Sequence, residues 1–149
     1  MIPTAARAPL AVGAAALVGV AYVGLVDPNE PGHYPLCPTK ALTGLDCPFC
    51  GGLRATHALA RGDLLGAADH NLLTVVLVVP VVLLWVAWLR REWIGDPDGE
   101  RAHPVQAVSD ALLRPAVLWP VVGALAVFTV VRNVGGVEVL AWLGSGAAA

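Results

Sequence analysis

Residues 72–89 read LLTVVLVVPVVLLWVAWL, an apolar stretch without a charged side chain that is followed at once by Arg90 and Arg91. A helix needs about 20 mostly apolar residues to cross roughly 30 Å of hydrocarbon. Pro80 is compatible with such a helix, because prolines in membranes kink a helix without ending it. The stretch therefore predicts a transmembrane helix, and it sets the fold class for the rest of the chain.

Two further stretches have the same character. Residues 8–26 carry no charge, and residues 112–131 are interrupted only near their start by Arg114 and Pro115. The first stretch is longer than the apolar core of a cleaved signal peptide, which is about 7–15 residues, so we expect it to be retained. The sequence thus predicts an all-α integral membrane protein, a single domain over residues 1–149 with three transmembrane helices.

The composition points to the same class of protein. Hydrophobic residues make up 57% of the chain and charged residues 13%, with a mean hydropathy of +0.71. Soluble domains average about 45–50% apolar and about 25% charged residues. The net charge of −2 gives no general attraction for nucleic acid. Residues 144–149 read GSGAAA, and we expect them to form a disordered tail.

The basic residues predict how the chain is inserted. The N-terminal side has five of them and the other side four: Arg7, Arg90, Arg91, Arg101 and Arg114, against Lys40, Arg54, Arg61 and Arg132. Residues near the ends of a span carry most weight, and three of the four lie well inside their loop. We therefore expect the N-terminus to be cytoplasmic, with the loop over residues 27–71 and the C-terminus outside the inner (plasma) membrane.

That loop contains the most reactive side chains of the protein. All three cysteines, Cys37, Cys47 and Cys50, lie in it. A helix is predicted to begin at Pro48, because proline suits the first helical position. Cys47 would then be the N-cap of this helix, where the positive end of the dipole favours a thiolate.

A second short helix is predicted at the end of the loop. Gly62 indicates the end of the first helix, and Asp63 is a suitable N-cap for another helix over residues 64–69. Both helices are too short and too polar to cross a membrane. We expect them to lie at the membrane interface or to tuck between the spans.

The cysteine segment resembles a family of small bacterial membrane proteins known as domain of unknown function 2752. The resemblance rests on Cys-Pro-x-Cys-Gly-x-x-Arg at residues 47–54 and covers roughly residues 36–134. Gly52, Leu53 and Leu73 depart from the family pattern, but no cysteine or arginine is lost. Because the family has no established activity, the resemblance implies an architecture and not a function. The remaining matches are Cys37-Pro38, Leu42-Thr43-Gly44, Ala55, Arg61-Gly62-Asp63-Leu64, Asn71-Leu72 and Arg132-Asn133.

Three kinds of chemistry fit the cysteines. A thiol–disulfide oxidoreductase would use Cys47 and Cys50, although no thioredoxin-like pattern surrounds them. A metal site would combine all three cysteines with His57, a composition known for structural zinc, although the gap to the histidine exceeds the usual three to five residues. His33 or Asp46 are alternative fourth ligands.

The third interpretation is a structural disulfide, which an oxidising compartment outside the membrane would favour. An odd number of cysteines cannot pair completely within one chain, so one thiol would remain. The sequence alone leaves the disulfide, the metal ion and the redox pair open.

Two arginines form a second group with Asn133. Arg54 follows the cysteine motif, and Arg132 lies at the end of the third span, beside Asn133. Ionisable residues at membrane depth often mark functional sites, and arginine can bind a lipid phosphate or a carboxylate through two parallel hydrogen bonds. For Arg132 we favour snorkelling to the headgroups, and for Arg54 an internal hydrogen bond to carbonyls of the loop. The candidate binding residues are thus Gly51, Arg54, Arg132, Asn133 and the cysteines.

The function that the sequence favours is a non-enzymatic accessory or assembly component with a structural or metal-stabilised cysteine loop. Three short spans leave little room for a substrate path, and small residues such as Gly19 and Gly123 suit close contacts between helices. A membrane thiol oxidoreductase and a small zinc- or iron-binding module are the alternatives. Besides the lipid bilayer, the expected partners are a larger membrane complex or further copies of the chain.

Overall fold

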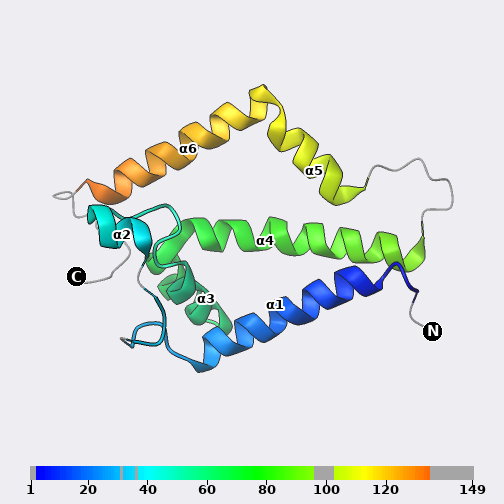
Figure 1. The fold of residues 1–149 in the computed structure, drawn as a ribbon, viewed down its shortest axis with the longest axis horizontal. Helices are drawn as coiled ribbons and strands as arrows, with labels where there is room; N and C mark the ends of the chain where they lie inside the picture. The colour runs from blue at the N-terminus through cyan, green and yellow to red at the C-terminus, as the bar shows by residue number, and fades with distance from the viewer. Residues whose placement is uncertain (1–2, 31, 36, 96–102, 135–149) are drawn as a thin grey trace.

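The computed structural model describes residues 3–30, 32–35, 37–95 and 103–134. In these ranges the chain is helical and contains no strand (Figure 1). The predicted tail over residues 144–149 lies outside them. The helices are α1 (Arg7–Leu25), α2 (Pro38–Thr43), α3 (Gly52–Ala60), α4 (Leu64–Ile94), α5 (Pro104–Leu113) and α6 (Pro115–Asn133).

Three of these helices are long and apolar enough to cross a membrane, as the sequence predicts. They are α1, α4 and α6, and their most apolar windows have mean hydropathies of 1.9, 2.8 and 1.7. The third begins at Pro115 and not at residue 112. Arg114 has an extended backbone because a residue before proline disfavours the helical region, and this separates α5 from α6.

The helix α4 consists of two pieces. Asn71 has φ −163° and ψ 99°, so the helix axis is interrupted there. The first piece is the short helix predicted after Asp63, whose carboxylate accepts a hydrogen bond from the backbone N–H of Gly66 at 2.8 Å. The second piece is the membrane helix proper, with Pro80 inside it.

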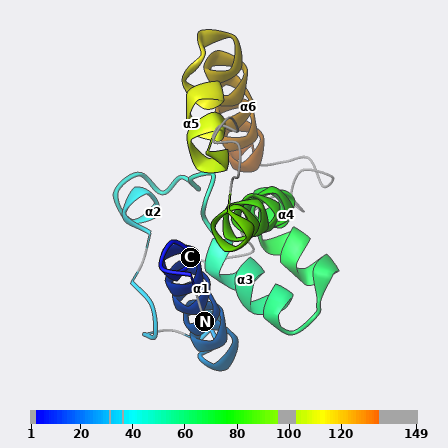
Figure 2. The same cartoon turned by 90° about the vertical axis from the view of Figure 1, so that its right-hand side faces the viewer.

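The short helix α3 lies between α1 and the beginning of α4 (Figures 1 and 2). Its contact with α4 is made by buried alanines, Ala55 and Ala58 on α3 and Ala67 on α4. Such small side chains let two helix backbones approach closely. The loop helix is thus tucked between the spans, one of the two positions expected from the sequence.

At its N-terminal end, α1 crosses the C-terminal half of α4. The indole N–H of Trp85 donates a hydrogen bond to the carbonyl oxygen of Pro9 at 2.9 Å. A Cβ atom at Gly13 would come within 2.5 Å of the same indole ring. Among the small residues, Gly13 therefore makes the close contact, whereas a Cβ atom at Gly19 or Gly123 would meet nothing within 4 Å.

The helix α6 stands apart from α4 along most of its length (Figures 1 and 2). It is joined to α4 through α5 at one end and through the cysteine loop at the other. A groove of about 410 Å³ lies between the two membrane helices. Its lining is apolar and consists of Phe49, Leu72, Leu73, Val76, Leu77, Val121, Ala124, Leu125 and Phe128.

The Gly13→Leu substitution is expected to destabilise the protein by about 1–3 kcal/mol, the usual cost of overpacking a tight contact. The added side chain would displace Trp85 and break its hydrogen bond to Pro9. Thermal unfolding in detergent, followed by tryptophan fluorescence, measures the effect. The matched control is Gly19→Leu, whose side chain enters open space. Equal melting temperatures for the two variants would contradict this packing.

Candidate functional site: three cysteines at the helix ends

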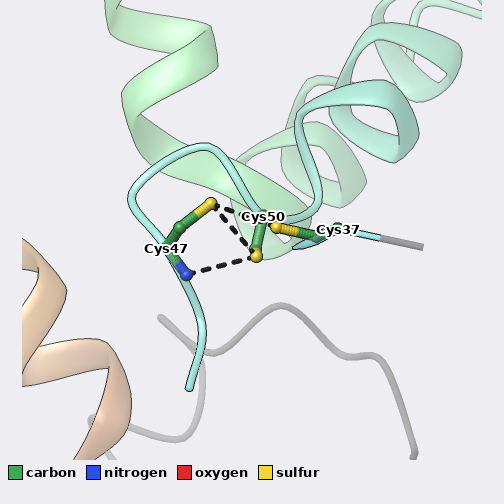
Figure 3. A group of neighbouring side chains, drawn as sticks. All are labelled: Cys37, Cys47 and Cys50. Atoms are coloured by element: carbon green, nitrogen blue, oxygen red, sulfur yellow. Dashed lines mark hydrogen bonds between the residues drawn. The ribbon is translucent and has the colours of Figure 1, made fainter. Parts of the chain in front are cut away.

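The three cysteines lie together at one end of the molecule, although Cys37 is ten residues from Cys47 in sequence. Their Sγ atoms all lie within 4.8 Å of one another, and Figure 3 shows the three side chains converging. Cys37 Sγ is 3.6 Å and Cys50 Sγ 3.3 Å from Cys47 Sγ. All three are free thiols, so the structure contains no disulfide among them.

Cys37 is the N-cap of α2. The backbone N–H of Lys40 stabilises its thiolate most, and the thiols of Cys50 and Cys47 contribute, against the effect of burial. Together these contacts lower the pKa of Cys37 to about 7. Cys47, which the sequence indicated as the N-cap of the following helix, does not cap α3, whose N-cap is Gly51. The cysteine at a helix N-cap is Cys37, on α2.

Cys47 and Cys50 lie in a turn before α3, and the prediction that this helix begins at Pro48 is wrong. The helix begins at Gly52, because Gly51 has φ +79°, and a residue in the left-handed conformation cannot be part of a right-handed helix. The turn is closed by hydrogen bonds from the backbone N–H of Cys50 to the Cys47 carbonyl at 3.0 Å and from the backbone N–H of Cys47 to Cys50 Sγ at 3.2 Å. Glycine is suited to position 51 because it adopts positive φ without steric cost.

Cys50 is the innermost of the three, with 6% of its surface exposed. Burial disfavours its thiolate, and its contacts with the Cys47 and Cys37 thiols add to this effect, so that the pKa of Cys50 rises to about 12. The cluster thus contains one acidic thiol at its edge and one weakly acidic thiol at its base. Without a bound cation, negative charge would be held mainly at Cys37.

The backbone of Cys50 is held by residues from two membrane helices. Its carbonyl oxygen accepts hydrogen bonds from Asn71 Nδ2 on α4 and from Arg132 Nη2 on α6, both at 2.9 Å. Asn71 Nδ2 also donates to the Pro48 carbonyl at 2.9 Å, and Asn71 Oδ1 accepts from the backbone N–H of Thr74 at 2.9 Å. Asn71 therefore caps the membrane part of α4 and fixes the cysteine turn at the same time.

Asn133 provides a further connection between α6 and the loop. Its side-chain amide accepts a hydrogen bond from the backbone N–H of Asp46 and donates one to the Asp46 carbonyl, both at 2.8 Å. The carboxylate of Asp46 in turn lies 3.1 Å from Lys40 Nζ. Asp46, which precedes Cys47, is thus bound to α6 through its backbone and to Lys40 on α2 through its side chain.

His57, the fourth metal ligand suggested by the sequence, is not part of the cluster. It is buried on α3 and faces the end of α1, where its Nδ1 lies 2.7 Å from the Val23 carbonyl oxygen. Its Nε2 lies 3.9 Å from Asp27 Oδ1. The six residues between Cys50 and His57 are nearly two turns of chain, which carry the imidazole away from the sulfur atoms.

The two arginines have different environments. Arg54 is half-buried on α3. The expectation that Arg132 snorkels to the membrane surface is wrong. The residue is 6% exposed, and its guanidinium carbon lies 5.2 Å from the centre of the Phe128 ring. The reason is the Cys50 carbonyl, which lies close enough to accept its hydrogen bond.

Sequence reasoning from residue types missed Asn71 as a site residue; it entered only as part of the family resemblance. A polar amide immediately before a long apolar run is a signal that could have identified it, because buried polar groups need partners. The two phenylalanines beside the site, Phe49 and Phe128, carried no distinguishing signal in a sequence this apolar.

The sulfur geometry is close to that of a metal site. Zinc–sulfur bonds of about 2.3 Å in a tetrahedron place sulfur atoms about 3.8 Å apart. Two of the Sγ–Sγ separations are 3.3 and 3.6 Å and all lie within 4.8 Å, so small side-chain adjustments would let the three sulfur atoms surround one ion. The same closeness would allow disulfide exchange among the thiols.

The alkylation rates of the thiols should follow their pKa values in the reduced, chelator-treated protein. Near pH 7, Cys37 is expected to react with iodoacetamide faster than the other two cysteines, because about half of it is thiolate at its pKa. Cys50 is expected to react most slowly of the three, because its thiolate stays scarce below pH 10. Peptide mass spectrometry after brief labelling at pH 6, 7 and 8 measures the order. Preferential labelling of Cys50 would contradict the arrangement of the cluster.

Comparison with known proteins gives one match. Residues 37–86 match the family model described as "Protein of unknown function (DUF2752)". The match begins at Cys37 and runs through the cysteine turn, α3 and most of α4. No curated protein and no solved structure matches the chain. Over residues 37–86 the chain is thus similar to the DUF2752 family, whose function is unknown.

Proposed function

We propose that the protein is a non-enzymatic membrane component, accessory to a larger assembly, whose cysteine loop is stabilised by a metal ion. Zinc is the candidate ion, and Cys37, Cys47 and Cys50 are the ligands. The observation that carries the proposal is the placement of all three Sγ atoms within 4.8 Å of one another, next to the ends of α4 and α6.

A metal ion at this position would act as a structural connection. It would join Cys37, which begins α2, to the turn before α3. Because the Cys50 carbonyl is bound by Asn71 and Arg132, the same connection would extend to α4 and α6. A site made only of sulfur favours zinc or an iron–sulfur centre over magnesium or calcium, which prefer oxygen ligands.

The coordination of such an ion would be incomplete within the cluster. Over the described residues, the group contains three ligands and no histidine or carboxylate as a fourth. Zinc in proteins takes four ligands, and a fourth position left by three protein ligands is filled by water or an external group. A side chain of an assembly partner is a suitable fourth ligand, which agrees with an accessory role.

The first test is native mass spectrometry of protein purified without reductant or chelator. We expect a mass increase of one zinc ion, which is lost in Cys47→Ser because two thiolates hold the ion too weakly. The matched control is His57→Asn, which should keep the metal because His57 contacts Val23 and not the cluster. A metal-free wild-type chain would refute the metal site, and metal loss in the control would return His57 to it.

A second candidate function is thiol–disulfide exchange, favoured by the short sulfur–sulfur distances and the lowered pKa of Cys37. The Cys37 thiolate would attack a disulfide of a partner protein, forming a mixed disulfide and releasing one partner thiolate. Cys47 would then attack Cys37, which yields an intramolecular disulfide and the reduced partner. In the same mass spectrum this function predicts a metal-free chain that is two hydrogens lighter.

For the orientation, we propose that the N-terminus is cytoplasmic and that the cysteine loop lies outside the inner membrane. The described helices agree with a loop at one common end, because the end of α1, the break in α4 and the end of α6 all adjoin α3 or the cysteine turn. The support for the direction remains the distribution of basic residues near the span ends.

Single cysteines in a cysteine-free background test this orientation. Thr43→Cys reports on the exposed surface of α2, and Ser109→Cys reports on the exposed surface of α5 near the opposite end. In intact cells a membrane-impermeant maleimide should label the first variant, and the second only after permeabilisation. The reverse pattern would show that the loop is cytoplasmic.

A further inference from the structure

Arg132 is a buried cation with incomplete bonding. Only 6% of its surface is exposed, and one nitrogen, Nη2, donates to the Cys50 carbonyl. Its Nε and Nη1 have no hydrogen-bond partner, and no carboxylate pairs with the guanidinium in the described part of the chain. A buried charge without a counter-ion is strongly disfavoured, so the site is suited to an anion that reaches the guanidinium.

The neighbourhood of Arg132 shows where the anion would come from. Phe128, whose ring lies beneath the guanidinium, also lines the groove between α4 and α6. Phe49, on the opposite wall, precedes Cys50, whose carbonyl accepts the arginine's one hydrogen bond. Arg132 does not itself line the groove, but its contacts with Phe128 and with the residue after Phe49 place it beside the groove, at the cysteine loop. The apolar length of the groove lies between the two membrane helices.

The groove itself is suited to hydrocarbon. All nine residues that line it are apolar, and its volume of about 410 Å³ falls within the range of ligand pockets, about 300–1,000 Å³. A free phosphate would leave these walls without a partner. A transmembrane helix of another protein would cover the walls but, being apolar, would leave Nε and Nη1 unpaired.

We propose that this groove binds an anionic phospholipid, with an acyl chain between α4 and α6 and the phosphate on the guanidinium of Arg132. The planar guanidinium has two edges that match two oxygens of a phosphate, Nε with Nη2 and Nη1 with Nη2. The Cys50 carbonyl takes one N–H of Nη2, so the second N–H of Nη2 can bind a phosphate together with the unpaired nitrogen on its edge. Arg132 lies in the last turn of α6, at the end of the span, which is the level of lipid headgroups.

Lipid binding at this groove is separate from metal binding at the cysteines. The nitrogen that reaches the cysteine turn is Nη2, and its acceptor is a carbonyl oxygen and not a sulfur atom. The nitrogens without a partner, Nε and Nη1, make no hydrogen bond with the cysteine turn. A metal-free protein would therefore still have the lipid site.

The test is native mass spectrometry of the full chain in detergent, titrated with phosphatidylglycerol. We expect one bound lipid, and an affinity at least about tenfold lower for Arg132→Gln, because the amide can still donate to the Cys50 carbonyl but cannot bind the phosphate. Arg90→Gln, at an exposed cation near the other end of α4, is the control and should bind normally.

A second pair of variants tests the acyl chain and does not touch the arginine. Ala124→Phe fills the groove and should also weaken lipid binding at least about tenfold. Ala126→Phe places the same ring on the exposed surface of α6 outside the groove and should have no effect.

Glycerol 3-phosphate, which has the phosphate without acyl chains, distinguishes a lipid site from a site for a free anion. We expect it not to displace the bound lipid at equal concentration. Displacement at equal concentration, or equal lipid affinity for Arg132→Gln and the wild type, or for Ala124→Phe and Ala126→Phe, would overturn the proposal.

Discussion

The arrangement of this protein depends on the carbonyl oxygen of Cys50, which accepts hydrogen bonds from Asn71 and Arg132 at 2.9 Å each. These two residues belong to different membrane helices, so one backbone atom connects α4, α6 and the loop between the first two spans. Hydrogen bonds to charged groups contribute about 1.5–3 kcal/mol, and leaving a buried partner unpaired costs about as much. The connection therefore stabilises the end of α6 against the loop.

This connection matters because α6 has few others. Asn133 adds a pair of hydrogen bonds to the backbone of Asp46, and at its other end α6 continues from α5. Between these attachments the helix stands off from α4 and leaves an apolar groove. The position of α6 therefore depends on polar contacts at the membrane boundary and on α5, because apolar side chains gain little by leaving lipid for another apolar helix.

Cys50 also links the two proposed sites. Its Sγ faces the thiols of Cys37 and Cys47, whereas its carbonyl faces the membrane helices. An ion bound by the sulfur atoms would fix the turn from outside, and Asn71 and Arg132 fix it from within. The polar contacts from Asn71 and Arg132 thus order the turn against the membrane helices, and a metal ion would add to them from the opposite side.

The sequence by itself determined the features that depend on local chemistry: three apolar spans, the Asp63 cap, and a loop containing every cysteine. Hydropathy and capping act over a few neighbouring residues, so they can be read from the chain. Tertiary structure alone decided that Cys37 and not Cys47 caps a helix, that His57 turns to Val23, and that Arg132 is buried. The placements of His57 and Arg132 depend on contacts with residues 34 and 82 positions away, for which no local pattern exists.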